Sequence, residues 1–134
     1  MSGEIDLGRM LSTLDAQREP GVFVFVGVPD YASAARLPAR AIVCERETVT
    51  VVLKREDAIA QGLFFDFEAA WLTLTVHSAL GAVGLTAAVA RVLAEDEIPC
   101  NVLAGAHHDH LLVPEHEAER ALAALARLRG VACT

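Results

Sequence analysis

The clearest pattern of secondary structure in the chain is in residues 71–95, WLTLTVHSALGAVGLTAAVARVLAE. Its first part, WLTLTV, alternates apolar side chains with threonines, as a half-buried strand does. The following segment, HSALGAVG, contains two glycines and predicts a loop. A helix over residues 85–95 is predicted because its apolar residues recur at helical spacing. These residues are Leu85, Val89, Val92 and Leu93.

The rest of the second half continues this alternation of strands and helices. Strands are predicted over residues 98–104 and 107–113, and a helix over residues 114–130, where the proline at its start is tolerated in the first turn. Residues 131–134 are expected to add a short last strand. The predicted order is therefore β-α-β-β-α-β, which favours an open sheet with helices on one face, a ferredoxin-like layout.

The first half predicts the same order with its first helix eroded. An amphipathic helix precedes it at residues 7–14. The further predicted elements are strands over residues 21–27, 40–45, 48–53 and 63–68, a loop with one helical turn over 29–38, and a helix over 54–61. We infer an α+β fold of two ferredoxin-like units packed side by side, the first of them degenerate. The expected division gives residues 1–68 to the N-terminal helix and the degenerate unit, and residues 69–134 to the second unit.

Composition narrows the classes of function. Hydrophobic residues make up 54% of the chain and charged residues 22%, which excludes a disordered protein. The formal net charge is −7 and no run of Lys and Arg occurs, so neither nucleic acid nor an anionic membrane is expected as a partner. No apolar stretch is long enough for a transmembrane helix. The large apolar share predicts a homodimer, because a second copy would cover part of the apolar surface.

The cysteines and the N-terminus bear on the compartment. Cys44, Cys100 and Cys133 are odd in number, widely spaced and set among apolar residues. This pattern is typical of buried, reduced thiols. The N-terminal residues are acidic and lack the charged-then-apolar pattern of a signal peptide. Together these features predict a cytoplasmic protein.

Three stretches of the second half carry a resemblance to a known family. They are residues 77–89 (HSALGAVGLTAAV), 93–102 (LAEDEIPCNV) and 109–114 (DHLLVP). The sequence resembles the paired ACT regulatory domains of aspartate kinase and of the cytosolic arginine sensors of animals. It is most similar to small stand-alone bacterial proteins with two such units. The resemblance implies an allosteric regulatory protein, neither an enzyme nor a cofactor binder, that holds a free amino acid or similar small zwitterion between two ACT units.

The start of the helix over residues 85–95 suits such a ligand. Backbone at Gly81 and Gly84 can approach a ligand closely because glycine has no side chain. The unpaired N–H groups and the positive dipole end of a helix suit a carboxylate, and the strand edge at residues 100–103 can offer carbonyls to an ammonium group. The residues that the resemblance assigns to the site are Ser78, Gly81, Ala82, Val83, Gly84, Leu85, Thr86, Asn101, Val102, Gly105, Ala106 and Asp109 of the second half, and Thr48 and Val49 of the first.

The resemblance also bears on which amino acid would bind. Asp109 matches an acidic position that faces a cationic side chain in the arginine sensors. Gly105 and Ala106 stand where those sensors have larger wall residues, and an acidic position near Ala82 is missing. Both differences argue against arginine as the ligand.

The histidines offer a different hypothesis, a His-dependent metal-binding protein. His107, His108, Asp109 and His110 are consecutive. On a strand, His108 and His110 would share one face and His107 and Asp109 the other, so a metal would need a further ligand such as His77 or His116. Catalysis by a nucleophile is not expected, because the chain has no Gly-x-Ser-x-Gly elbow and adjacency alone does not make Ser78 and His77 a productive pair.

A third hypothesis is a ligand-free structural or protein-interaction module. In that case the sheet pairs with a partner, and the cleft between the units is filled by side chains. The candidates for filling it are Leu80, Val83 and Phe25.

Overall fold

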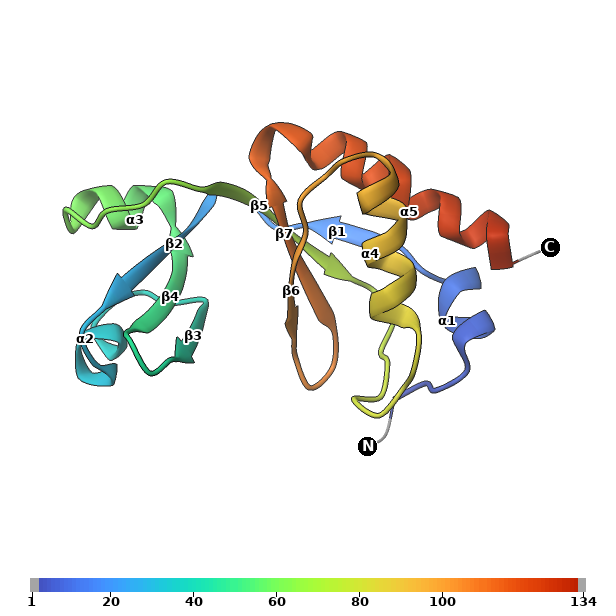
Figure 1. Ribbon diagram of the computed structural model, residues 1–134, viewed down its shortest axis with the longest axis horizontal. Coiled ribbons are helices and arrows are strands. Elements are labelled where there is room, and N and C mark those ends of the chain that lie inside the picture. Colours follow the sequence, from blue (N-terminus) through green and yellow to red (C-terminus); the bar gives the residue numbers. More distant parts are fainter. Residues whose placement is uncertain (1–2, 133–134) are drawn as a thin grey trace. The chain divides into compact units, whose positions relative to one another are not determined.

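The computed structural model describes residues 3–132 and contains two compact units (Figure 1). The split unit is formed within Met1–Glu19 and Ala70–Thr134, and the continuous unit is Pro20–Ala69. The N-terminal residues, which the sequence analysis placed with the first half, therefore cluster with the second half. No helix in the described part of the chain is long and apolar enough to cross a membrane.

The split unit contains a four-stranded sheet in the order β1-β5-β7-β6. Its elements are α1 (Leu7–Ser12), β1 (Ala16–Arg18), β5 (Glu68–Leu74), α4 (Leu85–Glu95), β6 (Asn101–Ala104), β7 (Asp109–Pro114), the 3-10 helix η1 (Glu115–Glu117) and α5 (Ala118–Ala132). β1 pairs antiparallel to β5, and β6 pairs antiparallel to β7. The order is that of a ferredoxin-like sheet in which β1, from the N-terminus, takes the position of the fourth strand.

The three longer helices of the split unit lie on one side of its strands (Figure 1). Alternate residues of β5 point into the core beneath them, because successive side chains of a strand face opposite sides. The core residues come from α1, β5, α4, β7 and α5 and include Met10, Leu11, Ala70, Leu72, Leu74, Val89, Leu93, Leu111, Val113, Ala121 and Leu125. The apolar face predicted for α4 is confirmed, since all four of its predicted residues are buried.

The continuous unit repeats the layout on a smaller scale. Its elements are β2 (Phe23–Val28), α2 (Tyr31–Ala35), β3 (Ala41–Cys44), β4 (Val49–Lys54) and α3 (Arg55–Ala60), completed by the first residues of β5. The strand order is β3-β4-β2-β5, and β2 pairs antiparallel to both β4 and β5. The erosion predicted for the first helix is confirmed, because α2 has only 5 residues against 11 in α4.

Three predictions about strands were wrong. Residues 63–67 form no strand, and the two strands predicted around residues 63–68 and 71–76 are the single strand β5. One strand suffices because Glu68 and Ala69 pair with β2, whereas residues 72–74 pair with β1. The strand expected at residues 131–134 is also absent where it can be checked. Residues up to 132 belong to α5, residues 133–134 lie outside the described residues, and β1 supplies the fourth strand instead.

The hairpin between β6 and β7 is shorter than predicted. The strand expected from residue 98 begins at Asn101, and the strand expected from residue 107 begins at Asp109. β7 begins late because of a tight turn in which the Gly105 N–H donates to the His108 carbonyl at 2.9 Å, whereas the Ile98 N–H is used at the end of α4, where it donates to the Leu93 carbonyl at 3.0 Å. His107 and His108 therefore lie in a turn, where the face alternation of a strand does not apply.

Candidate functional site

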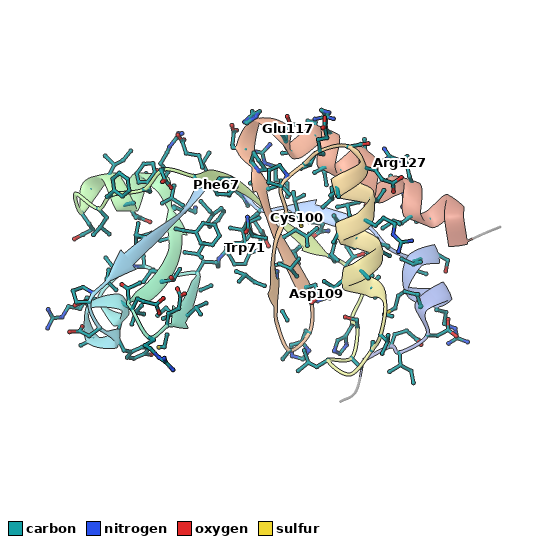
Figure 2. All side chains as sticks on the ribbon, in the orientation of Figure 1. Phe67, Trp71, Cys100, Asp109, Glu117 and Arg127 are labelled. Atoms are coloured by element: carbon teal, nitrogen blue, oxygen red, sulfur yellow. The ribbon has the colours of Figure 1, made fainter. Side chains whose placement is uncertain are left out.

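A small pocket lies in the split unit at the start of α4. Its volume is about 170 Å³. The lining comes from the loop before α4, the first turn of that helix, the end of β6 and the start of β7. The lining residues are Ser78, Ala79, Leu80, Ala82, Gly84, Leu85, Thr86, Ala104 and Asp109. Figure 2 shows Asp109 near the end of α4 at which this helix begins.

The first turn of α4 is not capped by a side chain. Gly84 is the N-cap residue, with φ 105° and ψ −21°, a conformation that L side chains rarely adopt. The first helical bond runs from the Ala88 N–H to the Gly84 carbonyl at 2.9 Å. Among the residues that the structure describes, none accepts a hydrogen bond from the amides of Leu85, Thr86 and Ala87. These donors and the positive dipole end are the chemistry that a carboxylate needs.

One carboxylate stands in the same pocket. Ser78 Oγ donates to Asp109 Oδ2 at 3.3 Å. Ser78 is only 9% exposed, whereas Asp109 is half-buried. Asp109 is the one charged residue among the lining residues described above. The pocket lining thus combines Leu85 and Thr86, whose amides have no acceptor among the described residues, with the carboxylate of Asp109.

The structure brings together six of the predicted site residues and leaves the others outside the pocket lining. Ser78, Ala82, Gly84, Leu85, Thr86 and Asp109 line the pocket. The Ala82 amide is not available to a ligand, because it donates to the Ala79 carbonyl at 3.0 Å. Gly81 and Val83 belong to the loop but not to the lining, and Val83 is 82% exposed.

The remaining predicted residues lie elsewhere. Asn101 and Val102 pair with β7, and Val102 also packs against the core. Gly105 and Ala106 form the turn beyond β6. Thr48 and Val49 belong to the continuous unit, where Thr48 Oγ1 donates to the Val28 carbonyl at 2.6 Å. Any contact of these residues with a ligand stays a prediction.

Three lining residues were missed by the sequence analysis: Ala79, Leu80 and Ala104. Ala79 and Leu80 lie between the predicted site residues Ser78 and Gly81. Their place in that loop was the only feature of the sequence that could have indicated them. Ala104 directly precedes Gly105, and its place opposite Asp109 in the β6–β7 register could be found only from the hairpin.

Three of the histidines, His77, His107 and His108, lie close to one another, and no histidine lines the pocket. His77 Nε2 and His107 Nδ1 are 3.4 Å apart, and the centroids of the His77 and His108 rings are 6.1 Å apart. His110 lies apart from them, with its Nδ1 at 3.0 Å from Thr73 Oγ1 and its ring against Trp71. Within residues 3–132 the structure contains no group of three His, Cys, Asp or Glu side chains that could hold a metal ion. The geometry therefore gives no support to the metal-binding hypothesis.

The cysteines differ in burial. Burial raises the pKa of the Cys100 thiol to about 11, so this thiol is protonated at neutral pH. Cys44 is exposed, which shows that the prediction of a buried thiol there was wrong. Cys44 occupies the end of the edge strand β3, where side chains have less cover than in a central strand. Cys133 lies outside the described residues.

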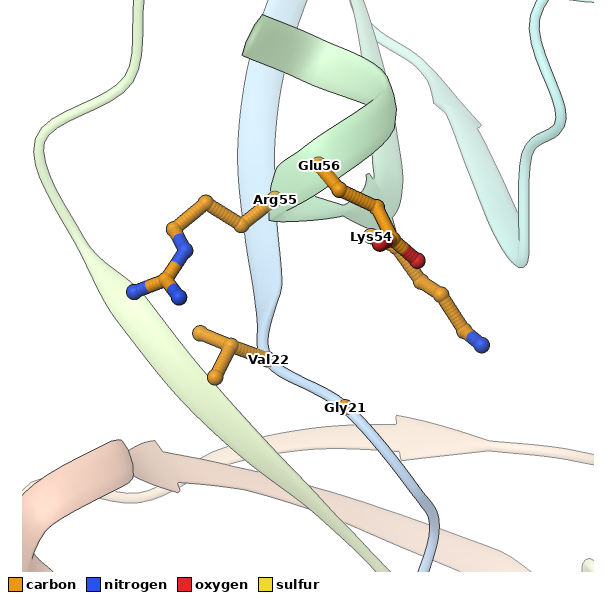
Figure 3. Close-up of a pocket in the computed structure, with 5 residues that line it drawn as sticks. All are labelled: Gly21, Val22, Lys54, Arg55 and Glu56. Carbon is orange, nitrogen blue, oxygen red and sulfur yellow. The ribbon is translucent and has the colours of Figure 1, made fainter.

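A second hollow of about 190 Å³ lies in the continuous unit (Figure 3). It is lined by Gly21, Val22, Lys54, Arg55 and Glu56. The Lys54 and Arg55 side chains extend in different directions, and Arg55 is paired with Glu68. Because the two cations do not converge on one point, this hollow lacks a built anion site.

Comparisons with known proteins agree with the two-unit architecture. Two family models of the ACT domain match the chain, one over residues 2–70 and the other over residues 66–127. A solved structure from Vibrio cholerae, of a protein of unknown function described as a possible transport protein, is 39% identical with a TM-score of 0.84, over 92% of this chain and 95% of that chain. No curated protein is significantly similar in sequence.

Two more distant structures share the fold. The regulatory subunit of aspartate kinase from Thermus flavus is 11% identical with a TM-score of 0.64, over 96% of this chain and 99% of that chain. The regulatory subunit of aspartate kinase from Thermus thermophilus, in a ligand-free form, is 11% identical with a TM-score of 0.58, over 84% of this chain and 95% of that chain.

Proposed function

The chain belongs to the ACT-domain family, with two tandem units, and from that premise we propose that it is a regulatory protein that binds a free amino acid in the pocket of the split unit. The family match and the fold of the aspartate kinase regulatory subunits support a regulatory role. The pocket supports a free amino acid as the class of ligand.

The observation that carries the proposal is the charge arrangement of the pocket. The unbonded amides of Leu85, Thr86 and Ala87 would donate hydrogen bonds to the α-carboxylate of the ligand. The Asp109 carboxylate would accept hydrogen bonds from its ammonium group. The volume of about 170 Å³ is below the ≈ 300–1,000 Å³ of pockets for drug-sized ligands, which suits a molecule with few atoms. A zwitterion satisfies both ends at once.

We further propose that the protein binds this ligand without transforming it. Neither His nor Cys lines the pocket, and its one hydroxyl close to a carboxylate, on Ser78, has no general base beside it other than Asp109. Such a pair lacks the third group that orients the base for covalent catalysis. A cytoplasmic location and a homodimer remain part of the proposal.

Calorimetry and thermal shift with each of the twenty protein amino acids, on protein refolded free of ligand, test the proposal. We expect one amino acid or a few to bind and to raise the melting temperature. Asp109→Asn should weaken that binding about tenfold or more, because it removes a charge-assisted bond. Glu47→Gln, an exposed carboxylate change in the continuous unit, is the matched control and should leave binding unchanged. Failure of every amino acid to bind would refute the proposal.

One observation favours a second candidate, the protein-interaction module. Leu80 and Val83, on the loop that forms the pocket, are 73% and 82% exposed, so neither is buried as a cleft-filling side chain would be. Large apolar side chains exposed on one loop are typical of a contact surface. This candidate predicts that Val83→Ser abolishes self-association in sedimentation experiments, whereas Asp109→Asn, inside the pocket, leaves self-association unchanged.

A further inference from the structure

A short N-terminal segment is bound to the loop that forms the pocket. This segment, residues 3–7, is called the strap below. The Glu4 N–H donates to the His77 carbonyl at 2.8 Å, and the Ala79 N–H donates to the Glu4 carbonyl at 2.9 Å. Glu4 and Ser78 thereby form an isolated parallel bridge. The strap is thus hydrogen-bonded on both sides of Ser78, the residue that donates to Asp109.

Two glycines allow the strap and the loop to approach closely. A Cβ atom on Gly3 would lie 2.5 Å from the His77 carbonyl oxygen and 2.6 Å from the Ser78 carbonyl carbon. At the other end of the strap, a Cβ atom on Gly84 would lie 2.8 Å from Leu7 Cδ2. The loop therefore contacts the strap twice, once at the lining residues Ser78 and Ala79 and once at the N-cap of α4.

The strap is itself held in place. Asp6 Oδ1 accepts from the Arg9 N–H at 2.9 Å and caps α1. Glu4 Oε1 accepts from the Asp6 N–H at 2.9 Å. Leu7 packs against the core of the split unit. These contacts fix the backbone of the strap against which the loop is hydrogen-bonded.

We propose that the strap is a positioning element that holds the loop over residues 77–84 in its ligand-ready arrangement. Within this loop, backbone bonding apart from the strap contacts is sparse, with the Ala82 N–H donating to the Ala79 carbonyl. When the strap is docked, Ser78 faces Asp109 and Gly84 leaves the α4 amides open. When it is displaced, the loop loses both backbone bonds and the pocket loses its wall.

The consequence is that the strap controls affinity at the pocket, because a ligand binds more tightly to a wall that is already ordered. The affinity part of this inference rests on the proposed function. The part that concerns loop order does not, and it can be tested without any ligand.

Amide hydrogen exchange on the full chain, with and without an equimolar mixture of the twenty protein amino acids, is the experiment. Gly3→Val displaces the strap, because its side chain would meet loop backbone. The matched control is Ile5→Ala, in the same segment, since Ile5 is 69% exposed. Without ligand, we expect exchange at Ala79 and Ala82 to be about tenfold or more faster in Gly3→Val, because local bonds open. Exchange at Leu93, in the core of α4, should stay as in the control.

Equal exchange at Ala79 in the two variants would overturn the proposal. So would an increase in Gly3→Val that is as large at Leu93 as at Ala79, because that pattern is general destabilisation of the split unit.

With the mixture present, we expect the wild-type loop to gain protection and Gly3→Val to gain at least tenfold less. If the wild type gains no protection, the proposed function fails. The exchange measured without ligand still shows whether the strap orders the loop. If the wild type and Gly3→Val gain equal protection, the strap does not position the pocket.

Discussion

Helices α2 and α4 hold the same place in the β-α-β-β-α-β order of their units, yet they begin in different ways. Asp30 caps α2, its carboxylate accepting the Ser33 N–H at 2.8 Å. The N-cap of α4 is Gly84, and no side chain caps that helix. The continuous unit thus supplies its own anion at the helix start, whereas the split unit leaves the corresponding donors open. Among the described residues, the uncapped helix is therefore the one at which we propose that a ligand carboxylate binds.

The two helices also differ in what stabilises them. α4 buries Leu85, Val89, Val92 and Leu93, whereas the buried residue of α2 is Ala34. Burying a Leu or Val side chain contributes about 1.5–3 kcal/mol, so packing can hold α4 without a cap. The short α2 depends more on its cap.

Truncating the core of α4 should have the largest effect. Leu93→Ala should lower the free energy of unfolding of the split unit by about 3 kcal/mol, since Leu93 is fully buried. Denaturant unfolding measures this loss. Ile59→Ala, on the exposed face of α3, is the control and should change the free energy of unfolding by less than about 0.5 kcal/mol. A loss as small for Leu93→Ala as for Ile59→Ala would show that packing does not hold α4.

Filling the N-cap of α4 should cost slightly less. Gly84→Val should lower the free energy of unfolding by about 2 kcal/mol, because φ is 105° and the new side chain would meet Leu7. Gly81→Ala is the matched control in the same loop, where a Cβ atom would meet nothing within 4 Å. If the two variants are equally stable in thermal unfolding, the N-cap conformation described for Gly84 is not the one in solution.

Removing the cap of α2 should have a smaller, pH-dependent effect. The hydrogen bond from the Ser33 amide holds the pKa of the Asp30 carboxyl below its usual 3.8. A carboxyl whose folded pKa is depressed stabilises the fold above its unfolded pKa, and this stabilisation is lost as the pH falls through the folded value.

Asp30→Ala should therefore destabilise the continuous unit at neutral pH and make little difference in acid well below 3.8. Unfolding curves of wild type and variant at the two pH values measure the effect. A difference between the proteins that does not shrink in acid would contradict the account.

The thiols of the two units should differ in reactivity without any change in stability. Cys44, exposed in the continuous unit, should be alkylated readily at neutral pH. Cys100, in the split unit, should react much more slowly until the pH nears about 11, because burial disfavours its thiolate. Peptide mapping after a short iodoacetamide pulse distinguishes the sites, and equal labelling of both would refute the prediction.

Local patterns in the sequence were enough for most elements of the fold. The helix over residues 85–95 was predicted to the residue, because its apolar spacing and the preceding glycine both mark it. β1 was missed because it is a three-residue strand, AQR, that owes its existence to pairing with β5. The sharing of β5 between the units was missed for the same reason, since pairing between distant segments leaves no local pattern.

The candidate site was predicted from local patterns as well, so contacts between residues far apart in the chain were missed there too. The glycine-containing loop and the start of α4 were identified because both are continuous in sequence. The hydrogen bond between Ser78 and Asp109 and the contact of Gly84 with Leu7 join residues far apart in the chain. No pattern in the sequence predicts the strap, because its bonds to the loop involve backbone atoms alone.

An NMR titration of ¹⁵N-labelled protein with a mixture of the twenty protein amino acids measures the contrast between the two helix starts within one sample. We expect the amide signals of Leu85, Thr86 and Ala87 to shift strongly on ligand addition, as new hydrogen bonds form, while the signal of the Ser33 amide, already bonded to Asp30, stays in place. Static signals at all three α4 amides, or a shift centred on Ser33, would contradict this expectation.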